Sequence, residues 1–120
     1  MEEDVGVEIS SEQDIAVMAF TVASISDFEK IAKIAKKVGQ FIEEQRPAKI
    51  IFDFEGVKFF SSQVLGLLID MRSKLQAYNG EVVVSAINPQ LYRIFKITNL
   101  DKIFRFFPDR QSAVDTVGAD

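Results

Sequence analysis

The side chains that could do chemistry in this chain of 120 residues are hydroxyls, carboxylates, lysines, arginines and tyrosines, because the sequence has no histidine and no cysteine. The absence of histidine excludes a Ser-His-Asp triad, an imidazole general base and a phosphohistidine relay. The absence of cysteine excludes a thiolate nucleophile, a disulfide and any zinc site that needs thiolates. The sequence therefore favours a regulatory or binding module over an enzyme, with no catalytic residue, metal site or cofactor expected.

Two adjacent hydroxyls, Ser61 and Ser62, lie at the expected start of a helix. A helix N-terminus has free amides and a positive dipole end, which would stabilise a phosphate on one of these serines. Serine is also among the commonest N-cap residues, so spacing alone favours a capping role. Both roles can coexist if one serine caps while its neighbour faces solvent. Phe59 and Phe60 precede the pair, and we expect one of these two aromatic rings in the core.

Other candidate groups lack partners. Asp53 lies near the end of an expected central strand, as in a receiver domain that is phosphorylated on aspartate. Such a site would need Mg²⁺ and further carboxylates nearby, and residues 19–21 supply none. Lys58, Tyr78 and Tyr92 are acid–base groups, but no two of them are expected to converge. No glycine-rich loop that would cradle a nucleotide phosphate is found.

The formal net charge is −4, which disfavours nucleic acid and anionic membrane as partners. No apolar run approaches the roughly 20 residues that cross a bilayer. The acidic start, residues 1–4, does not resemble a secretory signal, so we expect a cytoplasmic protein. A row of lysines at 30, 33, 36 and 37 could dock an acidic partner, although a solvated helix face is the favoured interpretation.

The hydrophobic pattern predicts one α/β domain over residues 1–120, with a mixed, mostly parallel sheet of about four to five strands and about four helices. The expected order is β-β-α-β-α-β-α-β-α. Strands are expected at Val5–Ser10, Ile15–Phe20, Ala48–Phe54, Glu81–Ile87 and Ile103–Phe107. This order places the loop after Phe54 beyond the carboxyl ends of the strands, where sites gather in open α/β sheets.

Helix boundaries follow from capping residues. Residues 26–29 form a capping box in which Ser26 is the expected N-cap. Pro47 closes that first helix, and its inner face is expected to consist of Phe28, Ile31, Ala35, Val38, Phe41 and Ile42. The second helix carries Val64 to Tyr78 and stops at Asn79-Gly80. The third begins at Asn88-Pro89 and ends at Asn99, and a closing helix covers Asp109 to Val117.

Two stretches resemble the STAS domain family, in the form found in bacterial anti-sigma factor antagonists. Residues 53–66 are similar to its signature, a strand ending in Asp followed by Val, an aromatic residue and Asp-Ser-Ser-Gly-Leu-Gly at the start of a helix. Residues 91–104 are similar to its C-terminal helix and strand. The chain departs from the signature at Ser61 for Asp, Gln63 for the second Ser and Val64 for Gly.

The resemblance implies a binding module that is switched by serine phosphorylation. The phosphorylated serine of the family aligns with Ser62, and Ser61 is the second choice. The resemblance implies an anti-sigma factor that is also a serine protein kinase, bound by the unphosphorylated form, and a serine phosphatase that restores binding. Phe59, Phe60, Ser61, Ser62 and Gln63 are the expected contact residues. The departures at three positions keep open a STAS-type scaffold or interaction module that is never phosphorylated.

Overall fold

The central sheet follows the apolar runs of the sequence. The computed structural model describes residues 5–120, so the acidic residues 1–4 lie outside the described part of the chain. The sheet has five strands in the order β1-β2-β4-β6-β7. Only β1 and β2 are antiparallel, and the other neighbours are parallel. The strands are β1 (Val7–Glu12), β2 (Ile15–Phe20), β4 (Lys49–Asp53), β6 (Glu81–Ser85) and β7 (Arg105–Phe107).

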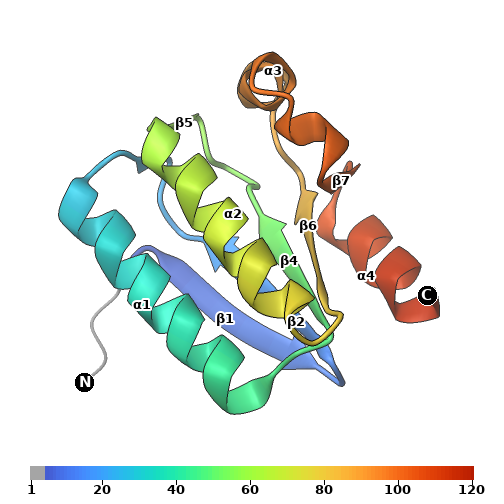
Figure 1. Ribbon diagram of the computed structural model, residues 1–120. Coiled ribbons are helices and arrows are strands. Elements are labelled where there is room, and N and C mark those ends of the chain that lie inside the picture. Colours follow the sequence, from blue (N-terminus) through green and yellow to red (C-terminus); the bar gives the residue numbers. More distant parts are fainter. Residues whose placement is uncertain (1–4) are drawn as a thin grey trace.

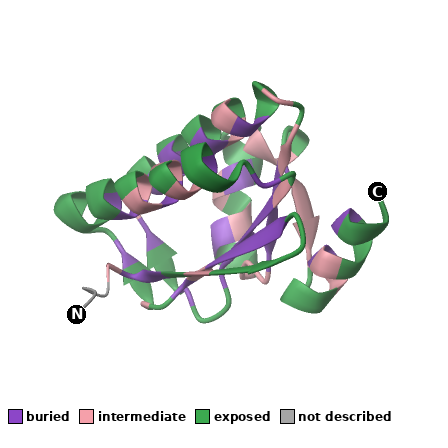
Figure 2. Cartoon of the chain, turned by 90° about the horizontal axis from the view of Figure 1, so that it is seen from below, coloured by how far each residue is buried: buried purple, intermediate pink, exposed green. Residues whose placement is uncertain are grey.

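The helices enclose this sheet unequally (Figure 1). Helices α1 (Phe28–Gln45) and α2 (Ser62–Gln76) pack on one face over the larger core. The other face has a smaller apolar cluster beneath α4 (Arg110–Ala119). Figure 2 shows the buried residues along the strands and on the helix faces turned toward them. The predicted fold, one α/β domain with a mixed sheet of about four to five strands and about four helices, is therefore confirmed: residues 5–120 form a mixed sheet of five strands and four α-helices.

Two short elements were not expected from the sequence. Strands β3 (Ser24–Ile25) and β5 (Phe59–Phe60) form a separate parallel pair with Ser24 opposite Phe59 and Ile25 opposite Phe60. A two-residue strand is too short to show the alternation that marks a strand in a sequence. This small pair anchors the segment that leads into α2.

The start of α1 differs from the expectation. The N-cap is Asp27 rather than Ser26, and its Oδ1 accepts from the amides of Glu29 at 2.9 Å and Lys30 at 3.1 Å. Serine and aspartate are equally good N-caps, so the sequence did not distinguish these neighbours. Phe28 was wrongly assigned to the inner face, because its side chain is 70% exposed on the first turn of the helix. Ile34 is buried in the core instead.

The remaining turns follow their sequence signals closely. Helix α3 (Pro89–Ile97) begins at Asn88, whose Oδ1 accepts from the Leu91 amide at 2.9 Å. A short 3-10 helix, η1 (Leu100–Lys102), follows Asn99, the expected end of the third helix, whose backbone is left-handed with φ of 63°. Strand β6 is shorter than predicted and ends before Ala86, whose φ of 57° turns the chain out of the strand. Within residues 5–120, no helix is long and apolar enough to cross a membrane.

Candidate functional site

The two candidate serines lie at the start of α2. Ser61 is the N-cap residue with an extended backbone, and Ser62 is the first residue of the helix. The Ser62 side chain is exposed, whereas Ser61 is half-buried. The Ser61 hydroxyl does not cap the helix and instead donates to Oε1 of the exposed Gln63 at 3.3 Å. The expected capping role of a serine side chain is therefore absent here, and Ser62 is the hydroxyl that faces solvent.

This helix start is electrostatically suited to an added anion. No side chain among the described residues caps α2, and its first turn contains no acidic residue. Amides at the start of a helix carry partial positive charge and lack partners within the helix. A phosphate on Ser62 would lie beside these amides and would be stabilised there.

The two aromatic residues before the serines point in opposite directions. Phe60 is only 2% exposed and packs edge-on against Phe54 and Phe95, with ring centroids 5.7 Å and 6.0 Å away. Phe59 is 53% exposed. The prediction that one of the pair belongs to the core is confirmed. Phe60 holds the segment in place, and Phe59 is the ring that another protein can reach.

Backbone hydrogen bonds fix the loop between β4 and α2. The Lys58 amide donates to the Ala23 carbonyl at 2.8 Å, and the Ser61 amide donates to the Ile25 carbonyl at 3.0 Å. Asn88 donates from its side-chain amide to the Val57 carbonyl at 3.1 Å. Residues 57–61 are thus tied to the start of α3 and to the segment before α1. The candidate site is a preformed surface.

Asp53 joins this loop to β6 and α4. Its carboxyl group is 2% exposed. Oδ1 accepts from the Ser85 hydroxyl and from the Glu55 amide, each at 3.2 Å. Oδ2 accepts from Arg110, at 2.9 Å from Nε and 2.8 Å from Nη2. A buried, ion-paired carboxylate is not available for phosphorylation, which argues against the receiver interpretation.

Sequence reasoning missed the partners of Asp53. Arg110 lies 57 positions away along the chain and Ser85 lies 32 positions away. The only available signal was a polar residue at the end of each buried strand, Asp53 on β4 and Ser85 on β6, which the parallel register places side by side. Within residues 5–120, no group of three or more acidic side chains could hold a metal ion.

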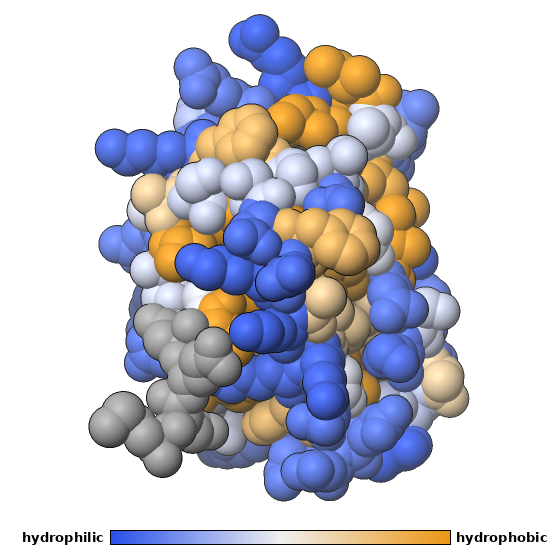
Figure 3. All heavy atoms as spheres, turned by 90° about the vertical axis from the view of Figure 1, so that its left-hand side faces the viewer, coloured by the Kyte–Doolittle hydropathy of each residue, from blue (hydrophilic) through white to orange (hydrophobic). Residues whose placement is uncertain are grey.

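A groove lies beside the candidate serines, between α1 and α2. It has a volume of about 270 Å³ and an apolar lining that includes Ile31, Ala35 and Leu67. The exposed Phe28 and Gln63 also line it, so the groove reaches the first turn of α2. In Figure 3, hydrophobic atoms gather in the upper half of this side of the molecule, and the lower half is mostly hydrophilic. The surface around the serines therefore combines a hydroxyl, an exposed ring and an apolar depression.

The other acid–base candidates do not meet. The Tyr78 hydroxyl donates to the Pro47 carbonyl at 2.8 Å. Burial raises the pKa of Tyr78, and the nearby Arg46 only partly opposes this effect. The Tyr92 ring packs edge-on against Phe106 with centroids 4.9 Å apart. Lys58 is exposed in the loop before β5. These side chains do not form a catalytic pair.

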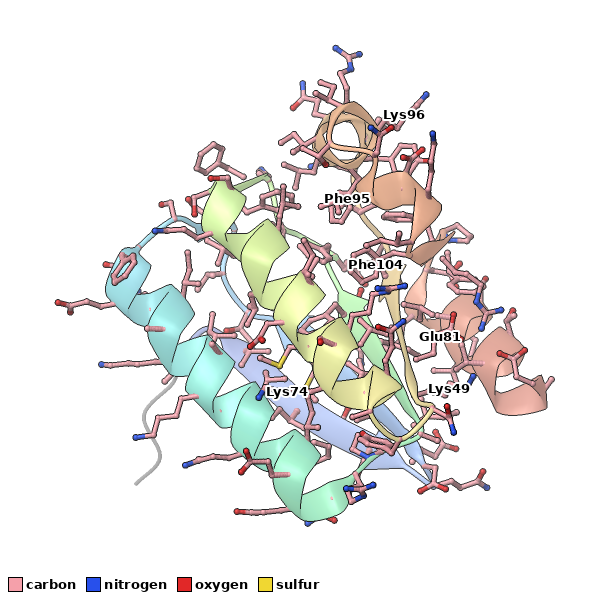
Figure 4. All side chains as sticks on the ribbon, viewed as in Figure 1. Lys49, Lys74, Glu81, Phe95, Lys96 and Phe104 are labelled. Carbon is pink, nitrogen blue, oxygen red and sulfur yellow. The ribbon has the colours of Figure 1, made fainter. Side chains whose placement is uncertain are left out.

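A charged cluster lies elsewhere in the molecule. Glu81 accepts from Arg105 at 2.6 Å and 2.8 Å and from Lys49 at 3.2 Å. Figure 4 shows Lys49 and Glu81 close together, whereas Phe95 and Lys96 lie at the other end of the molecule. Burial raises the pKa of Glu81, but the hydrogen bonds from Arg105 and Lys49 outweigh it, so the pKa is lowered. This cluster joins β4 and β6 to β7 and does not contribute to the candidate site.

Comparisons with known proteins identify the family and the fold of this chain. The sequence profile of the STAS domain family matches residues 8–113. The anti-sigma factor antagonist SpoIIAA in its unphosphorylated form superposes with a TM-score of 0.84 at 19% identity, covering 95% of this chain and 97% of SpoIIAA. The Bacillus SpoIIAA in its phosphorylated form gives a TM-score of 0.73 at 20% identity, covering 92% of this chain and 98% of that one.

A third solved structure is similar over nearly its full length. An anti-sigma factor antagonist from Mycobacterium paratuberculosis gives a TM-score of 0.80 at 22% identity and covers 98% of both chains. At these identities the structures establish a shared fold. Because the family profile covers most of the sequence and the element order agrees, this chain belongs to the STAS domain family.

Proposed function

We propose that this protein is an anti-sigma factor antagonist that is switched by phosphorylation of Ser62 and has no catalysis of its own. The observation that supports this proposal most is the exposed Ser62 hydroxyl on the first turn of an uncapped helix. Phe59, Ser61 and Gln63 surround it with reachable contact groups. The similarity to SpoIIAA, which is known in unphosphorylated and phosphorylated forms, supports the same function.

In this proposal the unphosphorylated surface binds an anti-sigma factor that is also a serine kinase. Phosphorylation adds a charge of about −1.5 to −2 at the centre of the contact surface. A partner that buries the neutral Ser62 hydroxyl would have to bury a dianion instead, which is unfavourable unless new cations pair with it. Binding is lost until a serine phosphatase removes the phosphate.

The test is phosphate mapping with a serine-kinase anti-sigma factor from the source organism. Intact mass and peptide mapping should place one phosphate on Ser62, and Ser62→Ala should remain unlabelled. Ser61→Ala is the matched control and should be labelled as the wild type is. Full labelling of Ser62→Ala on another residue would show that the proposed site is wrong.

A second candidate function is a STAS-type interaction module that is never phosphorylated. Two observations favour it. No carboxylate stands at position 61, so Ser62 lacks the acidic neighbour of the family signature. Val64 is fully buried in the core with no positive φ, so the flexibility that glycine would supply there is absent. Equal partner affinity of the wild type and Ser62→Asp in calorimetry would support this candidate over the switch.

A further inference from the structure

The outer face of α3 has a hollow that the proposed function does not use. Its volume is about 430 Å³, and it is lined by Pro89, Tyr92, Arg93, Lys96 and Ile97. The opposite face of α3 is fixed in the core through Leu91 and Phe95. Figure 4 shows Phe95 directed into the molecule and Lys96 directed away from it. The hollow is thus a surface feature on a firmly held helix.

The charge of this face is opposite to that of the whole protein. Helix α3 contains Arg93 and Lys96 and no acidic residue, whereas the chain carries a net charge of −4. Both side chains are exposed, and neither forms an ion pair within the part of the chain that the structure describes. The acidic residue that follows most closely in the sequence, Asp101, is half-buried in η1. The two cations are therefore free to pair with an external anion.

Apolar groups accompany these cations. Ile97 is 74% exposed, more than any other large hydrophobic side chain among residues 5–120. Ile97 lines the hollow together with the half-buried ring of Tyr92. Exposed apolar side chains gathered in one place mark interaction sites more often than isolated ones do. The face offers an apolar anchor beside two positive charges.

The α3 face is preorganised. Phe95 packs edge-on against Phe60, Phe104 and Phe106, with centroid distances of 6.0, 6.3 and 5.1 Å. Asn88 links the start of α3 to the loop before Ser61 through the Val57 carbonyl. A preformed face loses little conformational freedom on binding. It also lies at the same end of the molecule as the start of α2 (Figure 1).

We propose that the outer face of α3 binds an acidic, amphipathic segment of a partner protein. Carboxylates of the segment would pair with Arg93 and Lys96, and an apolar side chain would pack against Ile97 and Tyr92. A concave surface fits the ridge of a peptide better than the plane of a bilayer. The net charge of −4 also repels an anionic membrane. This surface is distinct from Ser62 and does not depend on its phosphorylation.

The test is a titration of the full ¹⁵N-labelled chain with a capped synthetic peptide of Glu and Leu in an amphipathic helical pattern. We expect saturable shifts of the amides of Tyr92, Arg93, Lys96 and Ile97, and weaker binding at high salt. The double variant R93E/K96E should weaken binding by about tenfold or more. Ile97→Ser, which removes the anchor and keeps the charges, should weaken it severalfold.

The matched control is K30E/K36E, which changes the net charge equally on exposed lysines of α1. This variant and Ser62→Ala should bind the peptide as the wild type does, so the result is independent of the proposed switch. Dispersed spectra will confirm that each variant is folded. The proposal is overturned if the amide shifts do not saturate with added peptide, or if R93E/K96E and K30E/K36E lose peptide affinity equally. It is also overturned if a peptide of Lys and Leu binds as tightly as the peptide of Glu and Leu. Binding of phosphatidylglycerol vesicles in place of the peptide would assign the face to a membrane and would also overturn it.

Discussion

Removal of the Arg110 side chain should destabilise the whole domain, although this residue lies on the surface of a peripheral helix. Arg110 is 47% exposed, but its guanidinium makes two short contacts to Oδ2 of Asp53, which is 2% exposed. Removing one partner of a fully buried ion pair costs about 3–5 kcal/mol, because a charge is left without compensation. In Arg110→Ala, Asp53 keeps its bonds from Ser85 and Glu55, and water can enter where arginine was exposed. We therefore expect a loss of about 2 kcal/mol in the free energy of unfolding.

The assay is urea unfolding followed by far-ultraviolet circular dichroism, with a double-mutant cycle. Asp53→Asn removes the charge that Arg110 compensates. The combined Asp53→Asn and Arg110→Ala variant should therefore lose less stability than the two single losses together, by about 1 kcal/mol or more. Arg93→Ala, which removes an arginine without an ion pair in the described part of the chain, should change stability by less than about 0.5 kcal/mol. If Arg110→Ala behaves like Arg93→Ala, or if the cycle is additive, the reasoning is refuted.

Three further predictions concern the helix start, the charged cluster and the aromatic pair. Ser62→Asp should raise the free energy of unfolding by about 0.3–1 kcal/mol, because a negative charge is placed at an uncapped helix start; Ser62→Lys should lower it, as measured by thermal melting. Arg105→Gln should lower the free energy of unfolding most at neutral pH. Because the pKa of Glu81 is lowered in the folded protein, the ionised Glu81 stabilises the fold fully above its ordinary pKa of 4.5. This stabilisation is lost as the pH falls through the lower pKa of the folded state. The stability difference between this variant and the wild type should therefore shrink in acid, and a constant difference would contradict the role of Glu81. Phe60→Ala should lower the free energy of unfolding by about 3–5 kcal/mol, because this ring is buried in the core. Phe59→Ala should leave the free energy of unfolding nearly unchanged, because this ring is exposed, and should weaken partner binding as measured by calorimetry.

Local signals predicted most of the fold. The continuous apolar runs of β4 and β6 identified strands that are buried on both faces, and Asn88-Pro89 marked the start of α3 within one residue. Features that depend on distant residues were not predictable in this way. The Asp53–Arg110 pair joins positions far apart in the chain, and β3 and β5 are stabilised by each other rather than by their own composition. The sequence left open which of the two serines caps α2 and which faces solvent, and the absence of a side-chain cap at Ser61 was not predictable from residue types.

The attachment of α4 has a consequence for the motions of the folded protein. A small apolar cluster that includes Ala113 and Val117 packs this helix against the sheet. Ion pairs hold its two ends: Arg110 pairs with Asp53 at the start, and Asp120 pairs with Lys49 and Arg105 at the end. Elements with few buried contacts open before the rest of a domain unfolds, and salt weakens exposed ion pairs. The amides of α4 should therefore exchange with solvent faster than those of β4 and β6, and faster still at high ionic strength. Each opening removes Arg110 from Asp53 and leaves this carboxylate with its bonds from Ser85 and from the Glu55 amide, at the start of the loop that leads to Ser62.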